Sequence, residues 1–123
     1  MPHALICSLD EPLSDLMCLA LERRGWEVRQ TRWAACCGDP AEGPATGPDA
    51  VEVVIADLDC PGPACWRAVP VLRGLFNARP LVLLAHDWPS FRQRQAWGLC
   101  GYIRKPIALT ELLRVVAELA PAG

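Results

Sequence analysis

The sequence predicts a doubly wound α/β domain built on a five-stranded parallel sheet with strand order 2-1-3-4-5. Short apolar runs alternate five times with longer stretches along the 123 residues, and most of those stretches have helical spacing. Several runs are apolar throughout, as expected for parallel strands that helices cover on both faces. Right-handed crossovers then favour the doubly wound order. The length fits one domain, so we expect residues 1–123 to form a single unit.

The expected strands are short and mostly apolar. The clearest is the Val-Glu-Val-Val-Ile-Ala run, and the chain offers one such run before each expected helix. The predicted strands are residues 4–8, 26–31, 51–56, 80–85 and 101–104.

The expected helices follow the strands, with one weak member. They are residues 12–24, 63–78, 89–97 and 109–120, and Gly25 ends the first of them. Pro70 should kink or divide the helix that contains it. The stretch 34–49 has the place of the second helix, but it carries three glycines and three prolines. We therefore expect that helix to be short or missing.

Composition excludes several classes of protein. Apolar residues make up 52% of the chain, which argues against disorder, and the net charge is -2 with acids and bases interspersed. No basic tract indicates nucleic-acid binding, and no run approaches the roughly 18 apolar residues of a membrane span. The seven cysteines include no Cys-x-x-Cys pair, so we read them as small buried side chains. These features predict a soluble cytoplasmic protein.

Charged residues follow three of the expected strands. Asp10 follows the first, Asp57 the third, and Lys105 the fifth. The carboxyl ends of parallel strands meet at one edge of the sheet, near the switch point between strands 1 and 3. Two carboxylates there would repel each other unless a cation such as Mg²⁺ intervened. A nearby ammonium group would balance the remaining charge and attract an anion.

Three segments in this order resemble motifs of the CheY-like receiver domains of response regulators, which have a flavodoxin-like fold. They are Ala4-Leu-Ile-Cys-Ser-Leu-Asp-Glu-Pro12, Asp57-Leu-Asp-Cys-Pro-Gly62 and Gly101-Tyr-Ile-Arg-Lys-Pro-Ile107. The resemblance covers nearly the whole chain and weakens around residues 34–49.

The resemblance implies a role for each residue at the strand ends. Asp57 would accept a phosphoryl group from a histidine kinase or a phosphotransfer protein, and Lys105 would contact that group. Mg²⁺ would bind Asp10, Asp57 and the backbone carbonyl of Asp59. The bond between Lys105 and Pro106 would be cis, as it typically is in the family. Such a domain is a signalling phosphoacceptor, with self-catalysed transfer and dephosphorylation at most, and not an enzyme.

Composition supports the position of Lys105 independently. The chain has eleven arginines and one lysine, and the one lysine is Lys105. A compact ammonium and a planar guanidinium are not interchangeable. The chance that a single lysine falls here among twelve basic positions is about one in twelve.

Two positions depart from the family pattern. Leu9 stands where the family has a second acid, so Mg²⁺ binding should be weaker. Ala85 stands where the family has Thr or Ser, and alanine cannot donate a hydrogen bond to the phosphoryl group. His86 follows it, but adjacent strand residues point to opposite faces. Tyr102 matches the aromatic residue that moves in the family's switch, although a half-buried strand aromatic is an equal interpretation.

The sequence leaves two functions open. The first is a phosphorylatable receiver. The alternative is a pseudo-receiver that works as a phosphorylation-independent protein-interaction module. Asp57 could also be a turn residue before Pro-Gly, and Asp10 a helix cap. By resemblance, a downstream protein would dock on the face of helix 4, strand 5 and helix 5, and a homodimer is left open.

Overall fold

The computed structural model describes residues 2–33, 51–58, 66–76, 79–98 and 100–120. The strands within these ranges are β1 (His3–Cys7), β2 (Glu27–Thr31), β3 (Val53–Asp57), β4 (Leu81–Ala85) and β5 (Cys100–Arg104). The helices are α1 (Glu11–Glu22), α2 (Ala68–Leu75), α3 (Phe91–Trp97) and α4 (Leu109–Leu119).

The five strands form one parallel sheet in the order β2-β1-β3-β4-β5, which confirms the predicted topology. The register pairs Cys7 with Thr31 and with Ala56, and it pairs Asp57 with Leu84. The carboxyl ends of β1, β2 and β3 therefore lie at a common edge. The ends of β4 and β5 lie at the same edge, because the register pairs Ala85 with Arg104.

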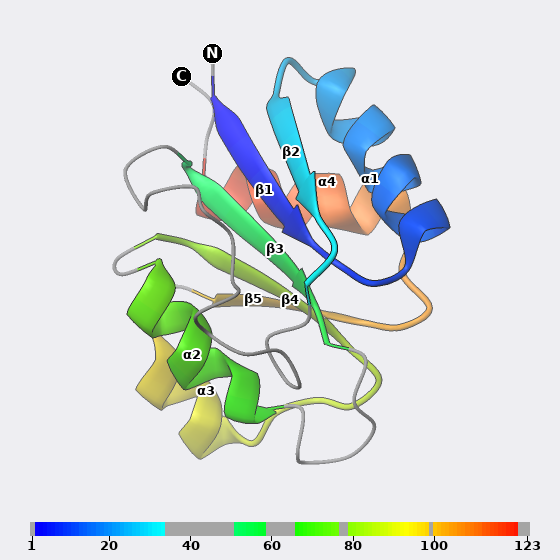
Figure 1. The fold of residues 1–123 in the computed structure, drawn as a ribbon. Coiled ribbons are helices and arrows are strands. Elements are labelled where there is room, and N and C mark those ends of the chain that lie inside the picture. The colour runs from blue at the N-terminus through cyan, green and yellow to red at the C-terminus, as the bar shows by residue number, and fades with distance from the viewer. Residues whose placement is uncertain (1, 34–50, 59–65, 77–78, 99, 121–123) are drawn as a thin grey trace.

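Helices cover both faces of the sheet: α1 and α4 lie on one face, and α2 and α3 lie on the other (Figure 1). Alternate side chains of the inner strands point to opposite faces of the sheet and pack in two separate hydrophobic cores. Ile6 and Ile55 belong to the core that contains Met17 of α1, whereas Leu5 belongs to the core that contains Leu72 of α2. The two buried faces explain why the inner strands are apolar at nearly every position.

Local signals set the ends of α1 as the sequence predicts. Asp10 is the N-cap, and its carboxylate accepts a hydrogen bond of 3.1 Å from the backbone N–H of Leu13. Pro12 lies in the first turn, where the missing N–H has no intrahelical partner to lose. Gly25, with a φ of 91°, lies just beyond the helix and lets the chain turn into β2.

The expectation that Pro70 kinks or divides its helix is wrong. The helix α2 begins at Ala68, so Pro70 is its third residue and lies in the first turn. A proline there removes no intrahelical hydrogen bond, because the first backbone N–H groups of a helix have no acceptor within it. The predicted extension back to residue 63 lies partly outside the described residues.

The prediction of a short or missing second helix falls on residues 34–49, which lie outside the described residues. So do four of the cysteines. Of the others, Cys7 is buried, Cys18 and Cys100 are half-buried, and all three are free thiols. Among the described helices, none has the length and apolar character needed to cross a membrane.

Candidate functional site

Asp57 is the last residue of β3, and the structure buries its side chain completely, with 0% exposed. A carboxylate taken out of water must gain charged or hydrogen-bonding partners to remain ionised. Asp57 has both kinds of partner. Its Oδ1 forms an ion pair with the ammonium group of Lys105, and its Oδ2 accepts a hydrogen bond from Ser8.

Lys105 reaches Asp57 from the end of β5. Its backbone N–H donates to the carbonyl of Ala85 at 2.8 Å, which continues the pairing of β4 and β5 beyond the last strand residue. The bond between Lys105 and Pro106 is cis, as the resemblance implies. Only 14% of the lysine side chain is exposed, so its charge lies between solvent and the buried carboxylate.

Asp10 takes the helix-capping role that the sequence left open. Its side chain accepts from Leu13, and its backbone N–H donates to the Oγ of Ser8 at 3.0 Å. Capping uses part of the acceptor capacity of the carboxylate, which has about four lone-pair sites. Capping and binding a cation are therefore compatible at Asp10.

A surface pocket of about 550 Å³ opens beside this edge of the sheet. Its lining residues are Asp10, Leu13, His86, Lys105, Pro106 and Ile107. An anion that entered the pocket would meet the ammonium of Lys105, which also contacts the buried carboxylate of Asp57. The pocket therefore borders the ion-pair partner of Asp57, although Asp57 itself does not line it.

Sequence reasoning missed Ser8 as a site residue. Ser8 is 1% exposed and donates to Asp57 Oδ2 at 2.8 Å. The sequence pattern identifies it only as the end of an apolar strand. The available signal was a single polar residue between the apolar run of β1 and Asp10, at the edge where Asp57 was expected. Buried hydroxyl groups usually have hydrogen-bond partners, so its position pointed to a polar neighbour.

His86 lies closer to the site than strand alternation suggested. The argument from opposite faces does not apply, because β4 ends at Ala85 and His86 follows the strand. His86 is exposed and lines the same pocket as Lys105, while its carbonyl accepts from Arg104 Nε at 3.1 Å. Leu9, the other departure near the site, is 42% exposed.

The two positions of the expected switch share one face of the sheet. Ala85 is buried in the core beneath α2, and Tyr102 packs against that core. The Tyr102 ring lies 6.5 Å from the Trp66 ring and 6.0 Å from the Trp97 ring, measured between centroids. Burial, followed by the influence of Cys100, raises the pKa of the Tyr102 phenol. The aromatic cluster of Trp66, Trp97 and Tyr102 thus links α3 and β5.

Only part of the magnesium site implied by the resemblance falls on described residues. Asp59, whose carbonyl was expected as a ligand, lies outside the described residues. Within them, no three Asp, Glu, His or Cys side chains gather as a metal cluster. Carboxylates such as those of Asp10 and Asp57 are hard oxygen donors of the kind that Mg²⁺ accepts, but both oxygens of Asp57 already have protein partners, Lys105 and Ser8.

Comparisons with solved structures bear on the fold. The chain superposes on the non-phosphorylated HemR receiver domain of Leptospira biflexa with a TM-score of 0.73 and 18% identity, covering 100% of this chain and 97% of that one. The chemotaxis response regulator CheY4 of Vibrio cholerae gives 0.72 and 18%, with coverages of 97% and 98%. A pilus assembly-related protein of Burkholderia pseudomallei gives 0.69 and 20%, with coverages of 100% and 95%.

These similarities define the class of fold. The chain has the CheY-like receiver fold along its whole length. Because the sequence identities are 18–20%, the likeness shows the fold alone. No protein-family model matches the sequence, and no curated protein matches it significantly.

Proposed function

We propose that the chain is a receiver domain in which Asp57 accepts a phosphoryl group from a phosphohistidine of a kinase or phosphotransfer protein. The observation that carries the proposal is the buried ion pair of Asp57 and Lys105 at the carboxyl edge of the sheet. A buried carboxylate in contact with the only lysine of the chain is an arrangement suited to phosphoryl transfer.

The reaction makes and breaks one bond each, and the protein acts mainly by positioning the groups and offsetting charge. A carboxylate oxygen of Asp57 attacks phosphorus, the P–N bond of the donor breaks, and the imidazole leaves with the electron pair and takes up a proton. Lys105 offsets the negative charge on the phosphoryl oxygens. Mg²⁺ would be held by Asp10, Asp57 and the carbonyl of Asp59, and it would supply further neutralisation of that charge. The outward Leu9 removes one acid, so we expect weak binding of this ion.

Phosphorylation with a small donor tests the proposal directly. Incubation with phosphoramidate and Mg²⁺, followed by intact mass, should add one phosphoryl group to the wild-type chain. Asp57→Asn should abolish the addition. Asp15→Asn is the matched control, because Asp15 is an exposed acid of α1 that bonds with Gln30 and does not contact Asp57. No adduct on the wild-type chain, or an adduct that Asp57→Asn retains, contradicts the proposal.

A second candidate function is a phosphorylation-independent interaction module in the cytoplasm. Ala85 favours it, because a methyl group cannot couple a phosphoryl group to Tyr102. Two large exposed side chains also favour it: Trp88 is 54% exposed and Phe91 is 67% exposed at the start of α3. The docking face of helix 4, strand 5 and helix 5 corresponds here to α3, β5 and α4.

Amide hydrogen exchange separates the two functions. In a switching receiver, phosphorylation should change exchange in α3 and β5, around Trp97 and Tyr102. In a module that works without phosphorylation, exchange on this face should stay the same, whether or not the adduct forms. Exchange in α2 serves as the internal reference.

A further inference from the structure

Ser8 makes a hydrogen bond to the candidate phosphoacceptor that the chemistry above does not use. Its Oγ lies 2.8 Å from Asp57 Oδ2 and 3.0 Å from the backbone nitrogen of Asp10. The backbone N–H of Asp10 is a donor, so the serine oxygen accepts there. A hydroxyl has one proton, and it is donated to the carboxylate of Asp57 at 2.8 Å, because the other acceptor, the carbonyl of Asp10, is charge-neutral and lies farther away at 3.4 Å.

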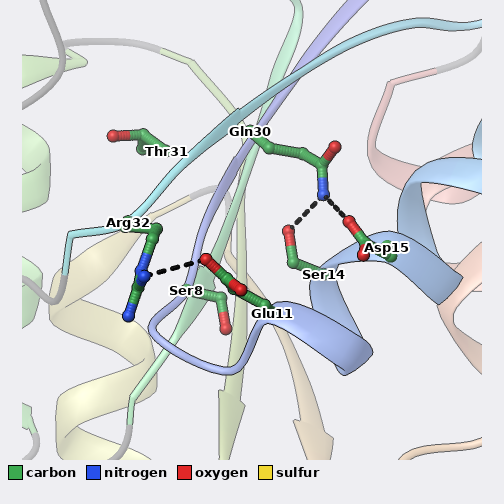
Figure 2. Close-up of a pocket in the computed structure, with 7 residues that line it drawn as sticks. All are labelled: Ser8, Glu11, Ser14, Asp15, Gln30, Thr31 and Arg32. Carbon is green, nitrogen blue, oxygen red and sulfur yellow. Dashed lines mark hydrogen bonds and ion pairs between the residues drawn. The ribbon is translucent and has the colours of Figure 1, made fainter.

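The position of this hydroxyl is fixed by the sheet. The backbone N–H of Ser8 donates to the carbonyl of Thr31 at 3.1 Å, one residue beyond the last pair of β1 and β2. Figure 2 shows Ser8 beside Glu11, where the chain passes from β1 to α1, at the wall of a polar pocket of about 320 Å³. The serine is therefore anchored on one side by β2 and on the other by Asp57.

The two oxygens of Asp57 have different environments. Oδ1 contacts Lys105, which lines the pocket that leads to solvent, whereas Oδ2 contacts the buried Ser8. A phosphoryl group that reaches Lys105 from the pocket would bond to Oδ1. Oδ2 then becomes the carbonyl oxygen of the acyl phosphate and loses its share of the negative charge.

A hydrogen bond to a charged acceptor is roughly twice as strong as one to a neutral acceptor. The Ser8 hydroxyl therefore stabilises the free carboxylate of Asp57 more than the acyl phosphate. During hydrolysis, water attacks phosphorus, the bond between phosphorus and Oδ1 breaks, and its electron pair returns to the carboxylate. Inorganic phosphate leaves with the oxygen and the protons of water. Charge grows on Oδ2 as the bond breaks, and the bond from Ser8 strengthens.

We propose that Ser8 is a positioning residue whose hydroxyl shortens the lifetime of the phosphorylated state by stabilising the departing carboxylate of Asp57. The proposal rests on the proposed function and adds a built-in control of how long the phosphoryl group stays. A structural role alone predicts no specific effect on this lifetime, which makes the lifetime a discriminating measurement.

The test is the decay of the adduct after the phosphoramidate is removed by desalting, followed by intact mass. Ser8→Ala should lengthen the half-life of the adduct by about three- to tenfold. Ser8→Thr keeps the hydroxyl and should restore a half-life near that of the wild type. Ser14→Ala is the matched control. Ser14 is also buried, but it bonds with Gln30 rather than Asp57, so the half-life of the adduct should be unchanged in this variant.

An equal or shorter half-life in Ser8→Ala overturns the proposal. A wild-type chain that takes up no phosphate removes the proposed function and this proposal together, whereas uptake with equal half-lives removes this proposal alone. Ser8→Cys supplies a second variant with a weaker donor and should lengthen the half-life if Ser8→Ala does not fold.

A double-variant comparison checks the hydrogen bond itself without phosphorylation. Ser8→Ala should lower the urea midpoint more in the wild-type background than in the Asp57→Asn background, where the hydroxyl meets only a neutral amide. Equal shifts in the two backgrounds mean that Ser8 does not stabilise the charge of Asp57, which also overturns the proposal.

Discussion

The ion pair of Asp57 and Lys105 predicts that its two halves are not equivalent for stability. Lys105→Met removes the ammonium and leaves the carboxylate of Asp57 buried with 0% of its side chain exposed. Breaking a buried pair in this way costs about 3–5 kcal/mol. The bond from Ser8 remains, and 14% of the Lys105 side chain is exposed, which places the pair close to solvent. We therefore expect the lower end, about 3 kcal/mol.

Asp57→Asn should cost much less. Lys105 also lines the adjoining pocket of about 550 Å³, so water can reach its ammonium when the charge of Asp57 is removed. We expect a change within about 1 kcal/mol. The double variant Lys105→Met with Asp57→Asn should recover most of the loss, because neither charge remains.

Urea unfolding followed by fluorescence of the five tryptophans measures these differences. Arg114→Met is the matched control. Arg114 forms an exposed pair with Glu118 at 3.0 Å, and its loss should change the unfolding free energy by no more than about 0.5 kcal/mol. Equal costs for Lys105→Met and Asp57→Asn, or a neutral Lys105→Met, would refute the reasoning from burial.

Further predictions concern the core and the helices. Gly101→Ala should destabilise the fold by about 1–3 kcal/mol, because its Cβ would overlap Val115 Cγ1. Gly74→Ala should instead stabilise the fold by about 0.5–1 kcal/mol, because Gly74 lies in a helix and nothing is within 4 Å of the new Cβ. Urea midpoints test both variants, and a shift of the same sign in both would contradict the argument from packing. Ser90→Ala should cost about 1 kcal/mol in the same assay, because it removes the N-cap of α3; no change would mean that the capping box adds nothing. Burial raises the pKa of the Cys7 thiol from 9.0 to about 12, so the unfolded chain loses this proton at a lower pH than the folded chain. The free energy of unfolding should therefore fall as the pH rises above 9, by up to about 1.4 kcal/mol per pH unit. Urea midpoints from pH 8 to 10.5 should decline less steeply for Cys7→Ala, and identical slopes would refute the assignment.

The topology and the meeting of Asp57 with Lys105 could be predicted from the sequence. Both follow from geometry, since parallel strands joined by crossovers bring their carboxyl ends to one edge whatever the details of packing. The N-cap role of Asp10 also follows, because the signal is local. The cis bond of Lys105 and Pro106 came from the resemblance alone.

Other features depend on contacts that a sequence pattern does not contain. The bond from Ser8 to Asp57 requires the register of β1 against β3 and the direction of a side chain just beyond a strand. The start of α2 at Ala68 depends on tertiary packing, which placed Pro70 in the first turn where proline is tolerated. His86 lines the pocket because it follows Ala85, the last residue of β4, where the alternation of strand side chains no longer sets its direction.

The most direct test of the central claim is the location of the phosphoryl group in the wild-type chain. Phosphorylation with phosphoramidate and Mg²⁺, reduction of the acyl phosphate with borohydride, and peptide mass mapping identify the modified side chain. Conversion of an aspartate to homoserine at position 57, absent when phosphoramidate is omitted, is the expected result. Conversion at another aspartate such as Asp10, or at none, would contradict the role assigned to Asp57.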